Sequence, residues 1–270
     1  MFQCDQLIYI QMQKTGCTHI TSLLSNLFDG KQIGKHNAAT KKQIRNTTYF
    51  ISSIRNPWDW YVSLWVFGVQ GKGALMHRLT QKNPVRYFKR AIKNPKRNFA
   101  WLYYELSNDT TSFWHNVYDR PDNVESFRKW LKLILDPDNS FYLSKGYSST
   151  EITDLCGFMT YRYLYLCCQN IREFKNSSSF CNYEDVVQFE INNCYIDFFI
   201  RQESLESDLC QAVEKVRPLN YKEKEFIYRK RKTNTSKREL STSDYYDEQS
   251  IELVSSREKL LIDKFGYSQP

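Results

Sequence analysis

The sequence predicts an α/β fold in which a parallel sheet is flanked by helices. Short apolar runs alternate with segments of helical spacing, an order typical of a parallel sheet covered on both faces. The first strand is expected at residues 7–13 (LIYIQMQ) and its helix at 18–28. A second strand at 48–54 precedes a helix that starts near Pro57, and a third at 195–200 precedes a helix at 205–216.

The remaining segments are expected to be mainly helical. Amphipathic helices are predicted at 149–169 and 247–265. Residues 68–150 are polar, aromatic and irregular, with short helices expected at 85–91 and 124–135. We therefore expect a single domain over 1–270, with its core in 1–67 and 151–270, and with 68–150 as a mostly helical insertion beside the sheet.

Composition excludes several classes of protein. The chain is 41% hydrophobic and 16% aromatic over 270 residues, which is too apolar for a disordered chain and long enough for a sizeable core. No run approaches the ~20 apolar residues of a membrane helix, and no basic, apolar leader precedes the first strand. These features favour a cytoplasmic protein, although a piece of a longer Golgi-lumen protein would look the same. Eight cysteines without zinc-site spacing predict reduced, mostly buried thiols.

The run QKTGCTH links the first strand to the first helix and carries the first chemical signal. Such a turn directs backbone N–H groups and the positive end of the helix dipole to one point, which favours a phosphate. Lys14 adds a charge, Thr15 and Thr18 add hydroxyl donors, and Gly16 allows close approach of an oxyanion. Lys14 precedes the glycine, so the run is not a Walker A loop. The alternative is an ordinary polar turn.

A second signal follows the second predicted strand, in the run RNPWDWYVS. Arg55 lies at the carboxyl end of that strand, where ligands of open α/β sheets bind. Ser63 lies about two turns into the next helix, so the two side chains can hold one phosphate together. We expect Asp59 to cap the helix or pair locally. Two motifs that suit phosphate binding, at the ends of neighbouring strands, indicate a ligand with phosphate groups at two places.

Together these motifs resemble those of the sulfotransferases that use 3′-phosphoadenosine 5′-phosphosulfate (PAPS). QKTGCTHI resembles the 5′-phosphosulfate loop of that superfamily, and IRNPWDWYVSLW resembles its 3′-phosphate motif. The resemblance covers residues 7–67 closely and resumes at 198–209, 232–236 and the C-terminal segment, nearer to the carbohydrate branch. It implies a P-loop-like sheet and a sulfuryl transfer from PAPS, without metal, to a hydroxyl of a glycan or a related small polar acceptor, leaving 3′,5′-diphosphoadenosine.

The resemblance also implies roles for individual residues. Lys14 would contact the phosphosulfate and stabilise the departing oxygen. The N–H groups from Thr15 through Gly16 and Cys17 to Thr18, with both threonine hydroxyls, would hold the 5′-phosphate. The 3′-phosphate would lie on Arg55 and Ser63. A loop at 232–236, with Thr235 and Ser236, would cover the nucleotide.

The acceptor hydroxyl needs a base, and histidine titrates nearest to neutrality. Among the four histidines we favour His36, in the run GKHNAAT, where similar enzymes place a Lys-His segment near the sulfate. Glu203 is the second candidate, although a structural pairing is expected to occupy it. His19 is expected to pack beside the loop, while His77 and His115 lie in the insertion.

The insertion and the basic segment leave alternatives open. Trp101 and Trp114 are the candidates for stacking on a sugar ring, and residues 68–150 are expected to carry acceptor specificity, or else to buttress the sheet. The formal net charge is +8, and residues 222–238 are rich in Lys and Arg. A P-loop kinase and a non-catalytic nucleotide- or RNA-binding module remain the rival hypotheses, although no nucleic-acid-binding motif accompanies the basic run. The sequence gives no indication of an oligomeric state.

Overall fold

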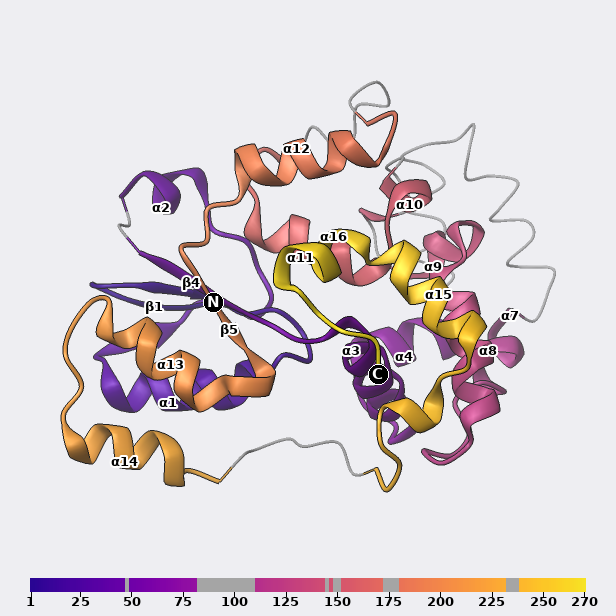
Figure 1. Ribbon diagram of the computed structural model, residues 1–270, viewed down its shortest axis with the longest axis horizontal. Coiled ribbons are helices and arrows are strands. Elements are labelled where there is room, and N and C mark those ends of the chain that lie inside the picture. Colours follow the sequence, from indigo (N-terminus) through magenta and orange to yellow (C-terminus); the bar gives the residue numbers. More distant parts are fainter. Residues whose placement is uncertain (47–48, 82–109, 144–145, 148–151, 172–179, 232–237) are drawn as a thin grey trace.

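A five-stranded sheet forms the centre of the fold (Figure 1). The computed structural model describes residues 1–46, 49–81, 110–143, 146–147, 152–171, 180–231 and 238–270. The strands lie in the order β3-β1-β2-β4-β5. Their bounds are β1 Phe2–Cys4, β2 Ile8–Ile10, β3 Gly30–Gln32, β4 Phe50–Ile54 and β5 Phe198–Arg201.

The sheet is mixed, so the prediction of a parallel sheet was wrong for one edge. β2, β4 and β5 run parallel, and these are the three predicted strands. β1 pairs antiparallel with both β2 and β3, and neither β1 nor β3 was predicted. A tight turn, closed by a bond from the Cys4 N–H to the Leu7 carbonyl (3.1 Å), joins β1 to β2, and such a turn permits only antiparallel pairing.

Helices cover both faces of the sheet. Alternate side chains of a strand point to opposite faces, and Tyr9 therefore packs with α1 (Cys17–Leu27) and α13 (Leu205–Glu214). Its neighbours Ile8 and Ile10 join a larger core that includes α3 (Pro57–Val69) and α11 (Phe158–Cys167). This arrangement confirms an α/β fold with its loops at the ends of the parallel strands.

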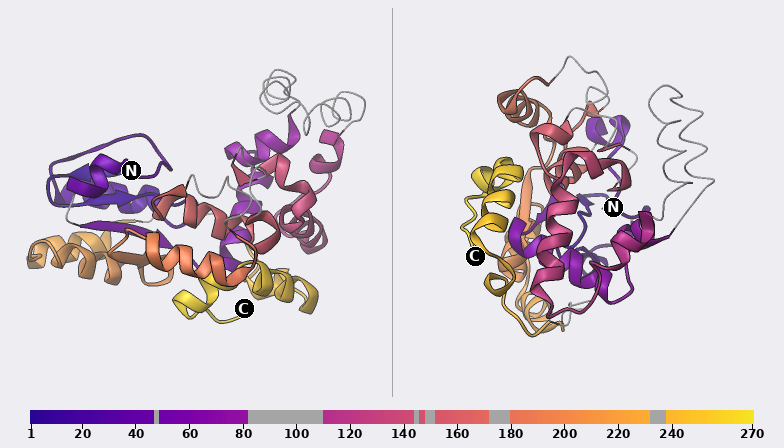
Figure 2. Two further views of the ribbon diagram at one scale, coloured as in Figure 1. Left: turned by 90° about the horizontal axis from the view of Figure 1, so that it is seen from above. Right: turned by 90° about the vertical axis from the view of Figure 1, so that its right-hand side faces the viewer.

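The other helices extend the molecule away from the sheet. Figures 1 and 2 show the sheet towards one end and α4, α7, α8 and α9 towards the other. No helix among the described residues is long and apolar enough to cross a membrane. The remaining helices are α2 Lys41–Asn46, α4 Ala74–Thr80, α7 Thr110–His115, α8 Val124–Leu135, α9 Ser140–Leu143, α10 Ile152–Leu155, α12 Tyr183–Asn193, α14 Tyr221–Arg229, α15 Glu248–Arg257 and α16 Lys259–Phe265, with 3-10 turns at Pro137–Asn139, Gln202–Ser204 and Ser243–Tyr245.

One buried carboxylate accounts for two differences from the predicted helices. The helix expected at 149–169 is broken into α10 and α11 before Gly157, and the one expected at 247–265 is broken into α15 and α16 at Glu258. The Glu258 carboxylate accepts the N–H groups of Met159 (3.1 Å) and Thr160 (2.7 Å), in the first turn of α11. It therefore caps α11 from a distant segment. A Cβ at Gly157 would lie 2.1 Å from Glu258 Oε1, so only glycine fits there.

Within 68–150 the described residues are largely helical. The helix predicted at 124–135 is confirmed as α8. The helix expected at 85–91 lies outside the described residues.

Candidate anion-binding and active site

The loop between β2 and α1 has the backbone shape of an anion site. Lys14 (φ 61°) and Gly16 (φ 79°) both adopt the left-handed conformation. Gly16 is also the N-cap residue of α1, and no described side chain caps that helix. A Cβ on Gly16 would lie 2.7 Å from Leu205 Cδ1, so space as well as conformation requires glycine. The backbone N–H groups in the first turn of α1 are therefore open to hydrogen bonds with a bound anion.

Trp60 of α3 and Arg55, which directly follows β4, hold this loop in place. Trp60 Nε1 donates to the Gln13 carbonyl (2.7 Å), and Arg55 Nη1 donates to the Lys14 carbonyl (3.1 Å). The Thr15 hydroxyl donates to the Met12 carbonyl (2.9 Å) and lies 2.6 Å from the Ser53 hydroxyl. Thr15 is fully buried, so its hydroxyl braces the loop and does not face a phosphate, contrary to the prediction. Only its backbone N–H remains a candidate contact.

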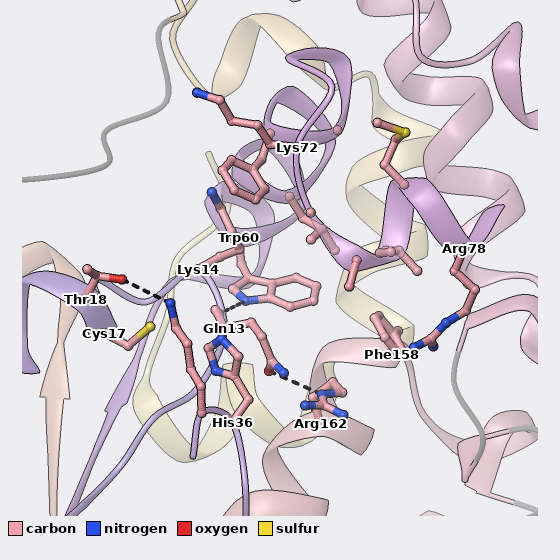
Figure 3. Close-up of a pocket in the computed structure, with 18 of the residues that line it drawn as sticks. Gln13, Lys14, Cys17, Thr18, His36, Trp60, Lys72, Arg78, Phe158 and Arg162 are labelled. Atoms are coloured by element: carbon pink, nitrogen blue, oxygen red, sulfur yellow. Dashed lines mark hydrogen bonds between the residues drawn. The ribbon is translucent and has the colours of Figure 1, made fainter. Parts of the chain in front are cut away.

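A cavity of about 460 Å³ opens beside the loop (Figure 3). Its walls come from the loop, the segment after β3, α3, α4 and α11, and they include Gly16, Cys17, Thr18 and His19. None of the described residues that line it is Asp or Glu. The basic side chains around it are Lys14, Lys35, His36, Lys72, Arg78 and Arg162. A low-dielectric wall with this charge favours an anionic ligand.

Lys14 extends into this cavity. Its ammonium lies 4.0 Å from the centroid of the Phe67 ring, a cation–π contact. Burial, together with the nearby Arg55 guanidinium, lowers the pKa of Lys14 from 10.5 to about 8. A lysine that is desolvated and faces another cation gains more from a bound anion than an exposed lysine does.

His36 follows β3 and reaches the same cavity, also from a left-handed backbone position (φ 55°). Its Nδ1 lies 3.0 Å from the Gln11 carbonyl oxygen. A carbonyl can only accept, so the proton is on Nδ1 and Nε2 carries the lone pair. Burial lowers the pKa of His36 to about 4, a decrease to which the neighbouring Lys35 and Arg162 contribute. The imidazole is therefore neutral at physiological pH.

The sequence analysis missed Arg162, which lies on α11. Its Nε donates to Gln13 Oε1 (3.2 Å), and Figure 3 shows the guanidinium close to His36. Burial lowers the pKa of Arg162, and among the described residues no carboxylate pairs with it. The available signal was a lone arginine in the apolar run FMTYRYLYLC. Arg162 could hold an anion in the cavity.

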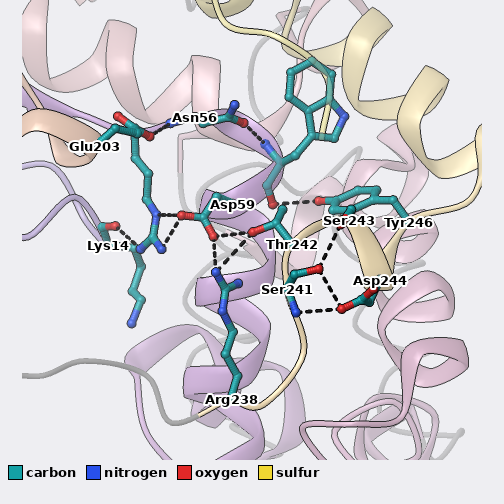
Figure 4. Close-up of polar contacts among 12 residues, drawn as sticks. Lys14, Asn56, Asp59, Glu203, Arg238, Ser241, Thr242, Ser243, Asp244 and Tyr246 are labelled. Atoms are coloured by element: carbon teal, nitrogen blue, oxygen red, sulfur yellow. Dashed lines mark hydrogen bonds and ion pairs between the residues drawn. The ribbon is translucent and has the colours of Figure 1, made fainter.

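Arg55 and Ser63 do not line this cavity. Arg55 forms an ion pair with Asp59 (2.5 Å), which also pairs with Arg238 (2.6 Å) and accepts from the Thr242 hydroxyl (2.8 Å; Figure 4). The expected local pairing of Asp59 is thereby confirmed. Its two guanidinium partners hold the pKa of Asp59 below its usual value despite burial. Ser63 is buried on α3. A phosphate at Arg55 therefore competes with Asp59.

Two other predicted contacts of the loop lie on the cavity wall. Cys17 is buried there, and Thr18 accepts a bond from the Lys35 ammonium (3.4 Å). The predicted nucleotide-covering residues Thr235 and Ser236 lie outside the described residues, as does Trp101.

The structure assigns structural contacts to the alternative residues. Trp114 is fully buried, so the prediction that it stacks on a sugar was wrong. Glu203 accepts the backbone N–H of Asn56 (2.6 Å), beside the start of α3, and does not line the cavity. His115 Nε2 lies 2.9 Å from the Thr80 carbonyl, while His77 is exposed.

Comparisons of the chain with protein-family models, curated proteins and solved structures found no match.

Proposed function

We propose that this protein is a PAPS-dependent sulfotransferase that transfers a sulfuryl group to a hydroxyl of a glycan or a related polar acceptor. The observation that carries the proposal is the acid-free cavity in which Lys14, the open end of α1 and His36 meet. PAPS would supply a sulfuryl group on a phosphate leaving group. Fixed cations and amides suit such a transfer, because positioning and charge stabilisation provide most of its catalysis.

The chain's own residues fit the donor at two places. Lys14 and the amides of the loop would hold the 5′-phosphate and the charge that develops on its oxygen. The 3′-phosphate would bind Arg55 and Ser63, with Arg238 as an additional cation, and would replace Asp59 as the partner of the two guanidinium groups. Because Arg55 also donates to the Lys14 carbonyl, the two phosphate sites share one side chain.

His36 suits the role of base through its orientation. The Gln11 carbonyl holds the Nδ1 proton, so Nε2 is the atom that would receive the acceptor's proton. An unperturbed imidazole would be partly protonated at pH 6.5, whereas His36 stays neutral at that pH and its Nε2 can accept a proton. The low pKa makes the free imidazole a weak base. Charge from the donor's sulfonate would raise it during the reaction.

The acceptor would enter between α4 and α11. Residues of the 68–150 segment, among them Lys72 and Arg78, line the same cavity as Lys14. This position supports a role of that segment in acceptor binding. Arg162, next to His36, would bind a carboxylate or sulfate of an acidic acceptor.

The kinase hypothesis is weaker. A P-loop kinase needs a carboxylate near the phosphates to hold Mg²⁺, and none of the described cavity residues offers one. The RNA-binding hypothesis needs an open basic surface with aromatic platforms. Helix α14 presents exposed Lys and Arg side chains beside the exposed rings of Tyr221 and Tyr228, but no described residue of α14 lines the cavity on which the proposal is based.

Calorimetry and a transfer assay test the proposal. With EDTA present, 3′,5′-diphosphoadenosine should bind much more tightly than AMP or ATP, because only it has phosphates for both sites. Incubation with ³⁵S-labelled PAPS and a panel of neutral and acidic saccharides should label an acceptor, and the His36→Ala variant should not. Equal affinity for AMP and the diphosphate, or tighter binding of ATP only with Mg²⁺, would contradict it.

A further inference from the structure

Two cysteines face each other where α11 and α12 end. Cys168 and Cys194 are the C-cap residues of these helices, and both have extended backbones. They form an isolated antiparallel bridge outside the main sheet. Figure 1 shows the two helices near each other on one side of the molecule.

The register of this bridge brings the two thiols together. The Gln169 N–H donates to the Asn193 carbonyl (2.9 Å) and the Tyr195 N–H to the Cys167 carbonyl (3.1 Å), one on either side of the pair. The cysteines are thus a non-hydrogen-bonded pair, for which the Cα atoms lie about 4.5 Å apart. That spacing falls within the range of roughly 4.4–6.8 Å that a disulfide spans. The two sulfur atoms lie within 4.8 Å of each other.

The surroundings give the two thiols different reactivity. A hydrogen bond from the Cys168 thiol, with smaller help from the Ile196 N–H, lowers the pKa of Cys194 to about 7. The same hydrogen bond and burial raise the pKa of Cys168. Cys194 is half-buried and Cys168 is buried. Cys194 is therefore the accessible thiolate, and Cys168 keeps its proton.

A metal is the alternative occupant of this cluster, since a Glu190 oxygen lies close to both sulfurs. That carboxylate is already engaged: Glu190 Oε1 accepts from the Tyr163 hydroxyl (2.7 Å) and from the Lys264 ammonium (2.7 Å). A divalent cation would have to displace the ammonium. The contacts at Glu190 thus favour a metal-free pair of thiols.

We infer that Cys168 and Cys194 are a reversible oxidation site that a hydroperoxide converts into a disulfide. The Cys194 thiolate attacks one peroxide oxygen, the O–O bond breaks, and a sulfenic acid forms at Cys194 while hydroxide or alkoxide leaves. The Cys168 sulfur then attacks the Cys194 sulfur, the S–O bond breaks, and water leaves with the Cys168 proton. In all, the two thiols lose two electrons and one peroxide gains them. Hydrogen peroxide yields two waters, and an organic hydroperoxide yields one water and one alcohol.

The disulfide would join the end of α11 to the chain that enters β5. Arg162 lies on α11, so the bond would tie one wall of the cavity to the sheet. A covalent link across this segment restricts the unfolded chain and stabilises the folded one. We therefore expect the oxidised protein to melt at a higher temperature than the reduced protein.

Peptide mapping of the full chain tests this inference. The reduced protein is treated with one equivalent of hydrogen peroxide at pH 7, alkylated and digested. A linked Cys168–Cys194 peptide that dithiothreitol releases is the expected product. Cys194 should react roughly threefold faster than an ordinary exposed cysteine, because its larger thiolate fraction outweighs its lower nucleophilicity.

Variants separate the two roles. Cys168→Ser should leave a sulfenic acid at Cys194 that dimedone traps, and Cys194→Ser should leave Cys168 unoxidised. Cys181→Ser, which removes an exposed cysteine outside the pair, should still form the linked peptide. The rise in melting temperature on oxidation should occur only where both cysteines of the pair are present.

Three results would overturn the inference. The first is that both cysteines stay alkylatable after peroxide, and the second is that another pair links instead. The third is that the reduced wild type binds zinc tightly and thereby loses the reactivity of both thiols. The wild-type mapping decides between these outcomes even if a serine variant does not fold. None of them bears on the proposed sulfuryl transfer.

Discussion

Raising the pH above 8 should weaken the binding of 3′,5′-diphosphoadenosine, because Lys14 loses its proton in the free protein. Burial and Arg55 lower the pKa of this ammonium from 10.5 to about 8. A phosphate next to the ammonium favours the charged form and raises the pKa again in the complex. Binding between these two pKa values must therefore be accompanied by proton uptake.

The pKa shift sets the size of the effect. It corresponds to about 3 kcal/mol by which the folded protein disfavours the charged ammonium. The dissociation constant should rise only about twofold between pH 7 and 8, since the phosphates titrate at about 6. Above pH 8 it should rise towards tenfold per pH unit. The stability of the free protein should change in the opposite direction. The folded pKa lies below the unfolded one, so the unfolded chain binds more protons between pH 8 and 10.5, and stability rises with pH.

Isothermal titration calorimetry at pH 8 in two buffers of different ionisation enthalpy measures the proton uptake, expected at about half a proton per nucleotide. Lys14→Arg should abolish the pH dependence, because arginine stays protonated. Lys35→Met, a change at another lysine of the same cavity, should retain it. Two other titratable groups that line the cavity do not account for a change near pH 8, because burial raises the pKa of Cys17 and lowers that of His36 to about 4. A constant affinity from pH 7 to 9.5 would refute this reasoning.

Three further outcomes are expected. His36→Ala should lower turnover ~10²–10⁴-fold with diphosphoadenosine affinity nearly unchanged, which steady-state rates and calorimetry check. The acid limb of the wild-type kcat/KM profile, which reports the free enzyme, should lie near pH 4 and not near 6.5, and it should be absent in the variant. Arg162→Gln should raise KM about 10- to 100-fold for an acidic acceptor and leave a neutral one unaffected, and an equal loss with both acceptors would point to a structural role. Asp59→Asn should tighten diphosphoadenosine binding several-fold, because Arg55 and Arg238 lose a competing anion; weaker binding by titration would mean that Asp59 holds the site in shape.

The sequence predicted those parts of the fold that depend on local pattern. The three parallel strands, α1, α3 and α8 follow apolar periodicity and start signals such as the proline at the head of α3. β3 could not be predicted in this way, because its residues Gly30–Gln32 are all exposed, carry no apolar side chain and pair with β1 through the backbone. The breaks at Gly157 and Glu258 depend on a contact between two distant segments, which no local pattern records.

The candidate site divides in the same way. The loop residues and Arg55 became candidates because each stands at the end of a predicted strand, whereas His36 became one through the resemblance to sulfotransferases and through its titration near neutrality. Arg162 was missed because its neighbours on α11 are apolar core residues, and only the packing of α11 against the loop turns its side chain into the cavity. Trp114 was predicted to be available to a sugar, but its ring is fully buried. The sequence could not show this, because the burial of an aromatic ring depends on which distant segments pack over it.

The bonds from Trp60 and Arg55 to the loop carbonyls also set the orientation of two peptide planes. The Gln13 and Lys14 carbonyl oxygens point at Trp60 Nε1 and Arg55 Nη1. In a trans peptide the N–H points opposite to the C=O. The N–H groups that share these two peptide planes therefore point away from Trp60 and Arg55, and the bonds keep the planes from rotating. Part of the anion binding that we propose for the loop would therefore come from fixed backbone dipoles and would survive a neutral side chain at position 14. These bonds also couple the two sequence motifs. A substitution at position 55 or 60 would release a peptide plane of the loop at residues 13–15, although that loop lies far away in the sequence.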